Sequence, residues 1–172
     1  MKEISKIKNE KIIALDLDDC IIPWMDFKNY KNYSMDYIIS ETEKNIKYIK
    51  EFCQKNNFKI VLTSSWSEEL NENFELKKQQ EKIYESLWNI IFSNIKDYLI
   101  SKDPFNDRIL CIDVLLDNNY VLAIDDLDLS HYFSSFSNFD MVNVVNGNKL
   151  QEKLKEIENK LKEYKRSTNE KN

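Results

Sequence analysis

Three short apolar runs in this chain each stop abruptly at polar or acidic residues, and this pattern restricts the possible folds more than any other feature. The runs are KIIAL (11–15), KIVL (59–62) and YVLAI (120–124), and they are followed by DLDD, TSS and DD. Short apolar runs that are rich in β-branched residues and bounded by polar ones are typical of buried strands. We predict these three strands and a fourth over residues 141–145 (MVNVV).

Segments with helical periodicity lie between and after these runs. Residues 38–52 and 67–99 carry apolar side chains at helical spacing, and residues 108–116 predict a shorter helix. A C-terminal helix is marked by four apolar residues at the same spacing, Leu150, Leu154, Ile157 and Leu161. Because parallel strands need long crossover connections, the alternation predicts an α/β fold, a three-layer Rossmann-like parallel sheet with helices on both faces.

The length of the chain predicts a single domain. Its 172 residues can form one core but are too few for two domains of typical size. We place the domain at residues 1–164 and a polar C-terminal tail at residues 165–172. The intervals between the predicted strands leave no room for a second, large domain inserted into the first.

Two carboxylates directly follow the first predicted strand. Asp16 and Asp18 are two residues apart, and side chains with this spacing point to the same side of an extended segment. One carboxylate can attack phosphorus while the other donates a proton to the leaving oxygen, which divides covalent and acid catalysis between them. That division requires unequal environments, because neighbouring carboxylates raise each other's affinity for protons.

A second acidic pair, Asp125 and Asp126, follows the third predicted strand. Ligands of parallel sheets bind outside the carboxyl ends of the strands, so we expect this pair to lie near Asp16. Carboxylates completed by water and substrate phosphate are typical ligands of Mg²⁺, which offsets the repulsion between an anionic nucleophile and a phosphate. Either acidic cluster taken alone is explained as well by the capping of a turn after its strand.

Hydroxyl groups follow the second predicted strand. Thr63, Ser64 and Ser65 can donate hydrogen bonds to a phosphoryl oxygen, which a phosphate site needs. A helix N-cap is the more common use of such residues directly before a helix.

Taken in order, these residues resemble the four motifs of the haloacid dehalogenase superfamily. Its first motif, DxDx[TV] after a strand, matches DLDDC, with Cys20 in place of the usual Thr or Val. Its second motif, a strand ending in Thr or Ser, matches KIVLTSS. Its third, a basic residue before the final core strand, matches Arg108, with Lys102 as the competing candidate. Its fourth, an acidic pair after a strand, matches YVLAIDD, and the resemblance spans residues 11–145.

The resemblance implies a magnesium-dependent phosphatase without a large cap domain. Asp16 would form an aspartyl-phosphate, and Asp18 would protonate the leaving group and then activate water. An acid at position 18 also separates the phosphatases from the dehalogenases of this superfamily. The implied phosphate-binding residues are Thr63, Ser64 and Arg108. The implied metal ligands are Asp16, the backbone carbonyl of Asp18, Asp125 and Asp126.

The expected substrate is a phosphomonoester, with nucleotides and nucleic-acid end phosphates as candidates. A site without a large cap suits a bulky phosphate or completion by a second subunit, and the DxD and TSSW sequences resemble phosphatase domains of phage and nucleic-acid end-repair proteins. Trp24 and Trp66 can stack on a base, although packing against loops is the more common role of such residues. The net charge of −5 disfavours extended duplex binding.

Three further polar residues are expected outside the chemistry. His131 is the single histidine and cannot form a zinc site alone, so we expect it at the surface or around the site. Asp19 and Asp128 are expected in turns or beside the site, with an approach of Asp128 to the metal as the alternative.

The remaining features predict a cytoplasmic protein. The N-terminal segment lacks an apolar stretch long enough for a signal peptide, and no run in the sequence approaches a membrane-spanning helix. The three cysteines, Cys20, Cys53 and Cys111, are odd in number and widely spaced, which predicts buried free thiols.

Two other functions are compatible with the same residues. A catalytically silent protein with this fold would bind a phosphate or nucleotide, or regulate a partner, without turnover. An interaction module would use the helical segment 67–99 to assemble with a copy of itself or with a partner, and a homo-oligomer is compatible with both readings.

Overall fold

The computed structural model describes residues 2–78 and 80–169, which form a five-stranded parallel sheet. The strands are β1 (Lys11–Leu15), β4 (Phe58–Leu62), β5 (Leu99–Lys102), β6 (Tyr120–Asp125) and β7 (Phe139–Asn143). Their order across the sheet is β5-β4-β1-β6-β7. The chain therefore moves outward from β1 in one direction, returns, and continues on the other side of β1. This reversal next to β1 is where parallel α/β sheets bind ligands.

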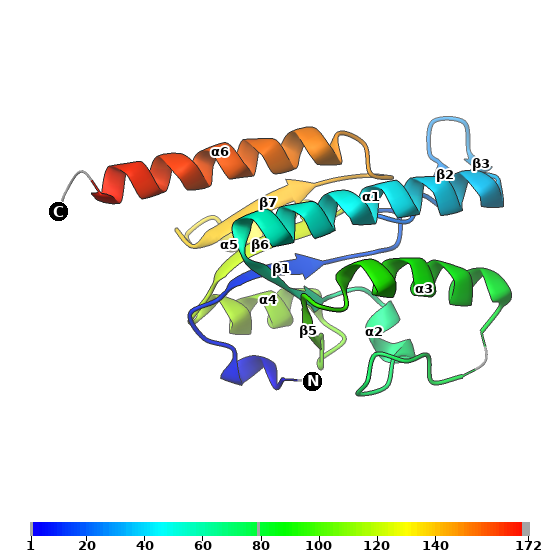
Figure 1. The fold of residues 1–172 in the computed structure, drawn as a ribbon, viewed down its shortest axis with the longest axis horizontal. Helices are drawn as coiled ribbons and strands as arrows, with labels where there is room; N and C mark the ends of the chain where they lie inside the picture. Colours follow the sequence, from blue (N-terminus) through cyan, green and yellow to red (C-terminus); the bar gives the residue numbers. More distant parts are fainter. Residues whose placement is uncertain (1, 79, 170–172) are drawn as a thin grey trace.

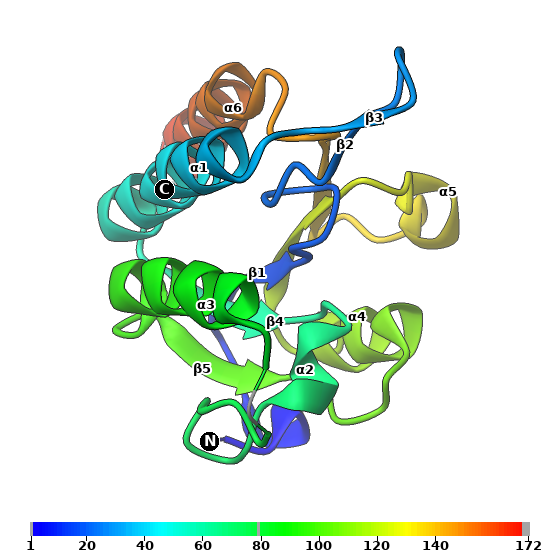
Figure 2. The same ribbon diagram turned by 90° about the vertical axis from the view of Figure 1, so that its right-hand side faces the viewer.

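Helices cover both faces of the sheet, as Figures 1 and 2 show. One face carries α1 (Met35–Asn56), α3 (Lys82–Ile95) and α6 (Leu150–Asn169). The other carries α4 (Arg108–Leu116), α5 (Ser130–Phe133) and the short 3-10 helix η1 (Ile4–Lys6). This arrangement confirms the predicted α/β class and the Rossmann-like parallel sheet.

Alternation along β1 explains why the sheet is covered on both sides. Ile13 and Leu15 belong to the core beneath α1, α3 and α6, whereas Ile12 and Ala14 pack with α4 and η1. All four side chains are at most 1% exposed. A strand that is buried on both faces reads as a continuous apolar run in the sequence, as KIIAL does.

The prediction of a helical segment over residues 67–99 is wrong in the middle of that segment and at its end. Only α2 (Trp66–Glu69) and α3 are helical, and Leu99 begins β5. Helix α2 is followed by a turn in which the Asn71 side chain accepts hydrogen bonds from the backbone N–H groups of Asn73 and Glu75. Such local bonds offer the backbone an alternative to the helix. The four-residue strand β5 was missed because Leu99 continues the helical spacing of Ile95.

The other predicted elements are confirmed with small shifts. The fourth predicted strand is β7, which begins and ends two residues earlier than residues 141–145. A small hairpin of β2 (Met25–Asp26) and β3 (Lys31–Asn32) follows β1 and projects from the body (Figure 2). The predicted polar tail, 165–172, is helical as far as Asn169, and residues 170–172 lie outside the described residues. Among the helices that the structure describes, none has the length and apolar character that a membrane crossing requires.

Candidate active site

The register of the sheet aligns the carboxyl ends of β4, β1 and β6. Leu15 pairs with Leu62 on one side and with Ile124 on the other. The next backbone bonds continue this register, because the Asp16 N–H donates to the Ile124 carbonyl at 3.0 Å and the Thr63 N–H donates to the Leu15 carbonyl at 2.9 Å. The residues that follow the three strands therefore lie side by side, as expected from the sequence.

Three carboxylates gather at this edge. Asp16, Asp125 and Asp126 each offer an oxygen, and these oxygens lie within 4.8 Å of one another. Asp16 is 3% exposed and Asp125 is 1% exposed, so two of the three carboxylates are buried. The Asn143 side-chain amide donates to the Asp126 carbonyl at 2.8 Å and so fixes the loop that carries the acidic pair. Each carboxylate offers one oxygen, so the three residues could hold a metal ion.

Arg108 lies against the same cluster. Its Nη1 is 2.7 Å from both carboxylate oxygens of Asp125 and 3.6 Å from Asp16 Oδ2. Helix α4 begins at Arg108 because the Asp107 side chain caps it by accepting from the N–H groups of Ile109 and Leu110. The guanidinium therefore reaches the carboxylates from the first residue of a capped helix.

Lys102, the competing basic candidate, points elsewhere. Its Nζ donates to the Ser67 carbonyl at 2.8 Å and to the Leu70 carbonyl, which places the charge beneath α2. Burial, followed by the nearby charge of Lys77, lowers the pKa of Lys102. Between the two basic residues, only Arg108 contacts the acidic cluster.

Burial and the charges nearby together set the pKa of Asp16. Burial raises its pKa to about 8, Arg108 opposes this rise, and Asp125 and Asp126 add to it. Burial also raises the pKa of Asp125, against the effects of the Leu127 N–H and Arg108. For Arg108, burial acts to lower the pKa, but Asp16 and Asp125 outweigh it and the pKa is raised. A cation among these carboxylates would favour the ionised Asp16 that nucleophilic attack requires.

Asp18 lies in a different environment. Its Oδ1 accepts hydrogen bonds from the indole N–H groups of Trp24, at 2.8 Å, and Trp66, at 3.0 Å. Its Oδ2 is 3.1 Å from the Ser65 hydroxyl. These donors are all uncharged, so the two carboxylates of the DLDD sequence have the unequal environments that divided roles require.

The hydroxyl residues after β4 separate into different positions. Thr63 directly follows β4, next to Asp16, and is 5% exposed. Ser64 is 2% exposed, and its Oγ accepts from the Trp66 N–H at 3.5 Å. Ser64 thus has a local contact at the start of α2, whereas Ser65, the N-cap residue of α2, makes no capping hydrogen bond with its side chain and instead contacts Asp18.

A loop after β7 supports the segment that carries Asp16 and Asp18. The Asn146 N–H donates to the Asp19 carbonyl at 2.6 Å, and the Gly147 N–H donates to the Cys20 carbonyl at 2.7 Å. From α1, the buried Asn45 amide donates to the Ile21 carbonyl at 3.0 Å. Gly147 has φ +68°, and a Cβ on it would lie 2.1 Å from Asn45 Nδ2. The single glycine of the chain is therefore required where this loop passes Asn45.

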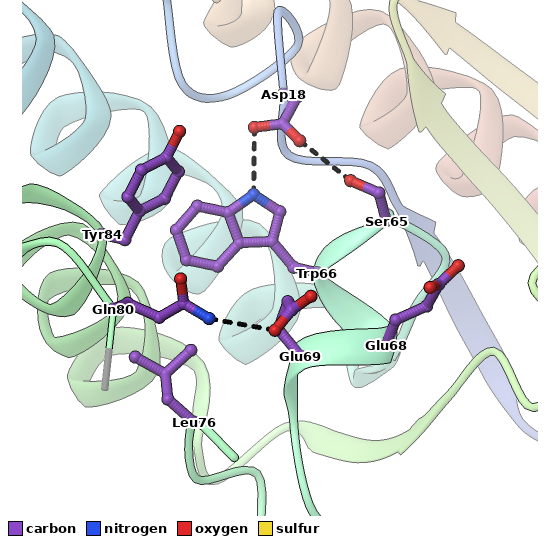
Figure 3. A pocket seen from close by; sticks show the side chains of 8 residues that line it. All are labelled: Asp18, Ser65, Trp66, Glu68, Glu69, Leu76, Gln80 and Tyr84. Atoms are coloured by element: carbon purple, nitrogen blue, oxygen red, sulfur yellow. Dashed lines mark hydrogen bonds between the residues drawn. The ribbon is translucent and has the colours of Figure 1, made fainter. Parts of the chain in front are cut away.

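A cavity of about 380 Å³ opens beside Asp18 (Figure 3). The rest of its lining is formed by Ser65, Trp66, Glu68, Glu69, Leu76, Gln80 and Tyr84. Trp66 directs its indole nitrogen toward Asp18, and Gln80 donates to Glu69 at 2.9 Å. The cavity thus joins aromatic and acidic groups to the carboxylate that is the candidate proton donor.

The remaining predicted residues lie outside this constellation. Asp128 is exposed and accepts from the Ser130 N–H at 3.0 Å, and it does not belong to the carboxylate cluster found among the described residues. His131 lies against Tyr132, with 3.9 Å between the ring centroids. Asp19 adopts φ 52° in the loop after Asp18. Cys20, Cys53 and Cys111 are buried free thiols, as predicted.

Several of these contacts have no direct signal in the sequence. Trp24 and Trp66 were expected to pack or to stack on a substrate. Both rings pack against Tyr84, and their indole N–H groups also donate to Asp18, which was not predicted. The contacts of Asn45, Asn143 and Gly147 with backbone atoms of other segments depend on the path of distant loops. For Gly147, the sole occurrence of glycine in the chain was a usable signal.

Comparison of the chain with known protein families, with curated proteins and with solved structures gives no match.

Proposed function

We propose that this protein is a magnesium-dependent phosphomonoester hydrolase of the haloacid dehalogenase type that acts through an aspartyl-phosphate on Asp16. One observation carries the proposal. Asp16 lies in a cluster of carboxylates with Arg108 at the edge of the sheet, while Asp18, two residues later, is held separately beside a cavity. Family membership is part of the proposal, and the order of the four motifs along the chain supports it.

The residues of the cluster fit a magnesium ion. Asp16, Asp125 and Asp126 supply oxygen ligands close enough to share one ion, and the backbone carbonyl of Asp18 is the further ligand that the family pattern implies. When bound, Mg²⁺ supplies positive charge that stabilises the transferring phosphoryl group and the ionised form of Asp16.

The chemistry proceeds in two displacements. An Asp16 carboxylate oxygen attacks phosphorus, the ester P–O bond breaks, and the leaving oxygen takes the proton of Asp18. Asp18, now ionised, accepts a proton from water as that water attacks phosphorus, and the bond between phosphorus and Asp16 breaks. Inorganic phosphate and the starting carboxylate of Asp16 result. Thr63 and Arg108 bind phosphoryl oxygens, as donors aimed at the transferring group must.

The lining of the cavity beside Asp18 suits a small planar leaving group. A group that Asp18 protonates must leave on the Asp18 side, where Trp66 and Tyr84 provide aromatic walls. Glu68 and Glu69 line the same cavity and repel a second phosphate. Among the nucleotide and nucleic-acid end phosphates that the sequence suggested, a nucleoside monophosphate fits this lining better than an oligonucleotide.

The test is release of inorganic phosphate by the purified full chain from p-nitrophenyl phosphate and nucleoside monophosphates, with MgCl₂ and with EDTA. We expect release only with Mg²⁺, its loss in Asp16→Asn, and its retention in the matched control Asp128→Asn. Equal release without metal, or full activity of Asp16→Asn, would contradict the proposal. Saturable Mg²⁺ binding without turnover would support the silent binding protein instead.

A further inference from the structure

Two tryptophans from separate parts of the chain donate to the same oxygen of Asp18. Trp24 precedes the β2–β3 hairpin and Trp66 begins α2, and their indole N–H groups lie 2.8 Å and 3.0 Å from Asp18 Oδ1. Trp88, the third tryptophan, donates to the Phe74 backbone carbonyl at 2.9 Å instead. A buried indole N–H needs an acceptor, but a backbone carbonyl suffices for it, as at Trp88. The requirement of an indole N–H for an acceptor therefore does not explain why both indoles donate to the same oxygen of Asp18.

Packing fixes the orientation of both indoles. The ring of Tyr84, from α3, lies 5.6 Å from that of Trp24 and 5.7 Å from that of Trp66, centroid to centroid. Trp66 is also 6.1 Å from Trp88, and it is 5% exposed. The two N–H donors are thus held by a cluster of rings and converge on one oxygen of Asp18.

The contacts of the two Asp18 oxygens differ, and this difference bears on where a proton can be placed. A carboxyl oxygen that accepts two N–H bonds has both lone pairs engaged, so a proton on Asp18 belongs on Oδ2. Oδ2 is the oxygen that lies 3.1 Å from the Ser65 hydroxyl, and Asp18 and Ser65 both line the cavity (Figure 3).

We propose that Trp24 and Trp66 are positioning residues that lock the Asp18 carboxyl group so that Oδ2 presents its proton to the leaving group in the cavity. The inference rests on the proposed phosphatase function, in which Asp18 is the general acid. Neither tryptophan touches the reacting atoms. Their effect passes through the orientation of Asp18.

The test replaces each indole by a phenyl ring, in Trp24→Phe, Trp66→Phe and the double variant, which removes the N–H and keeps an aromatic ring. For each variant, kcat/KM is measured with p-nitrophenyl phosphate, whose leaving group departs without a proton, and with an alkyl phosphate, whose leaving group needs one. Since kcat/KM reports the step up to leaving-group departure, the ratio of the two values isolates acid catalysis.

We expect the ratio of kcat/KM for the alkyl ester to that for the aryl ester to fall about 10-fold to 100-fold, a part of the full contribution of a general acid. In Trp24→Phe, whose ring does not line the cavity, the aryl ester itself should change little. In an Asp18→Asn background the same substitutions should leave the ratio unchanged, because the group they position no longer donates a proton. Trp88→Phe, whose N–H bonds the Phe74 carbonyl, is the matched control and should leave the ratio unchanged.

A proportional loss with both esters, or no loss with either, would overturn the positioning role. If Trp66→Phe does not fold, Trp24→Phe carries the test alone, because Trp24 is only half-buried and circular dichroism can establish its fold. A wild-type chain that hydrolyses neither ester with Mg²⁺ would instead refute the proposed function, and this inference with it.

Discussion

Asp16 and Asp18 are neighbours in the sequence, but the fold surrounds them with opposite kinds of groups. Asp16 is buried among charges, with Arg108 at 3.6 Å and two further carboxylates within reach of a shared ion. Asp18 is half-buried, and among the described residues its hydrogen-bond donors are uncharged, two indoles and a hydroxyl. Burial and the surrounding charges set the pKa of Asp16, whereas the two indole N–H groups determine where Oδ1 of Asp18 points. One sequence motif thus supplies two carboxylates whose environments are set by the elements packed around them.

Of the variants that distinguish Asp16 from Asp18, Asp18→Asn is expected to have the largest effect on kcat/KM. The amide oxygen can still accept both indole N–H bonds, so the geometry remains while the proton donor is lost. We expect kcat/KM for an alkyl phosphate to fall about 10²-fold to 10⁴-fold, with much less change for p-nitrophenyl phosphate. Steady-state kinetics with the two esters measures this, and an equal loss with both would contradict the division of roles.

Arg108→Met tests the charged side of the comparison. Removing a donor aimed at the transferring phosphoryl group should lower kcat about 10²-fold to 10³-fold. Lys102→Met is the matched control, because Lys102 binds the Ser67 and Leu70 carbonyls rather than the carboxylates. The control should lower the melting temperature and leave kcat nearly unchanged. If Lys102→Met abolished catalysis while Arg108→Met did not, the assignment of the basic residue would be reversed.

The pH dependence of stability provides a third test. The pKa of Asp16 is raised to about 8 in the folded state, above its unfolded value of about 3.9. The folded state therefore binds a proton that the unfolded state lacks, so this group lowers the free energy of unfolding as the pH rises between these values.

Magnesium binding needs the ionised carboxylate, so its stabilising effect should grow over the same range of pH. We expect MgCl₂ to raise the melting temperature by several degrees at about pH 8 and by much less at about pH 5. Asp16→Asn should remove most of this difference. A magnesium effect of equal size at both pH values would contradict the link between the metal and Asp16.

Gly147→Ala is expected to change the difference between Asp16 and Asp18 least, because it disturbs a loop that supports both carboxylates. The new Cβ would lie 2.1 Å from Asn45 Nδ2, at a φ of +68°. We expect a loss of about 2 kcal/mol in the free energy of unfolding, measured by urea denaturation. Both esters should be affected in the same proportion, unlike the result for the tryptophans. The neighbouring Asn148→Ala is the control and should be close to wild type.

The sequence was sufficient where local pattern and sheet geometry determine the outcome. Asp16, Thr63 and Asp125 each follow an apolar run, and parallel strands necessarily bring their carboxyl ends to one edge. The choice between Arg108 and Lys102 could not be made, because both follow β4 and only the path of α4 decides which reaches the carboxylates. The contacts of Trp24 and Trp66 with Asp18 could not be predicted either, since they join segments 42 residues apart through the packing of Tyr84 against both.

The most direct test of the two roles is to locate the phosphoryl group in Asp18→Asn. In this variant p-nitrophenyl phosphate should still phosphorylate Asp16, but the intermediate should persist because the group that activates water is missing. Rapid acid quenching with peptide mass spectrometry should find the phosphoryl group on the peptide that contains Asp16, and Asp16→Asn should show none. A phosphoryl group on another residue would contradict the account. So would the absence of any phosphorylated peptide from an Asp18→Asn variant that still hydrolyses the aryl ester with wild-type kcat/KM.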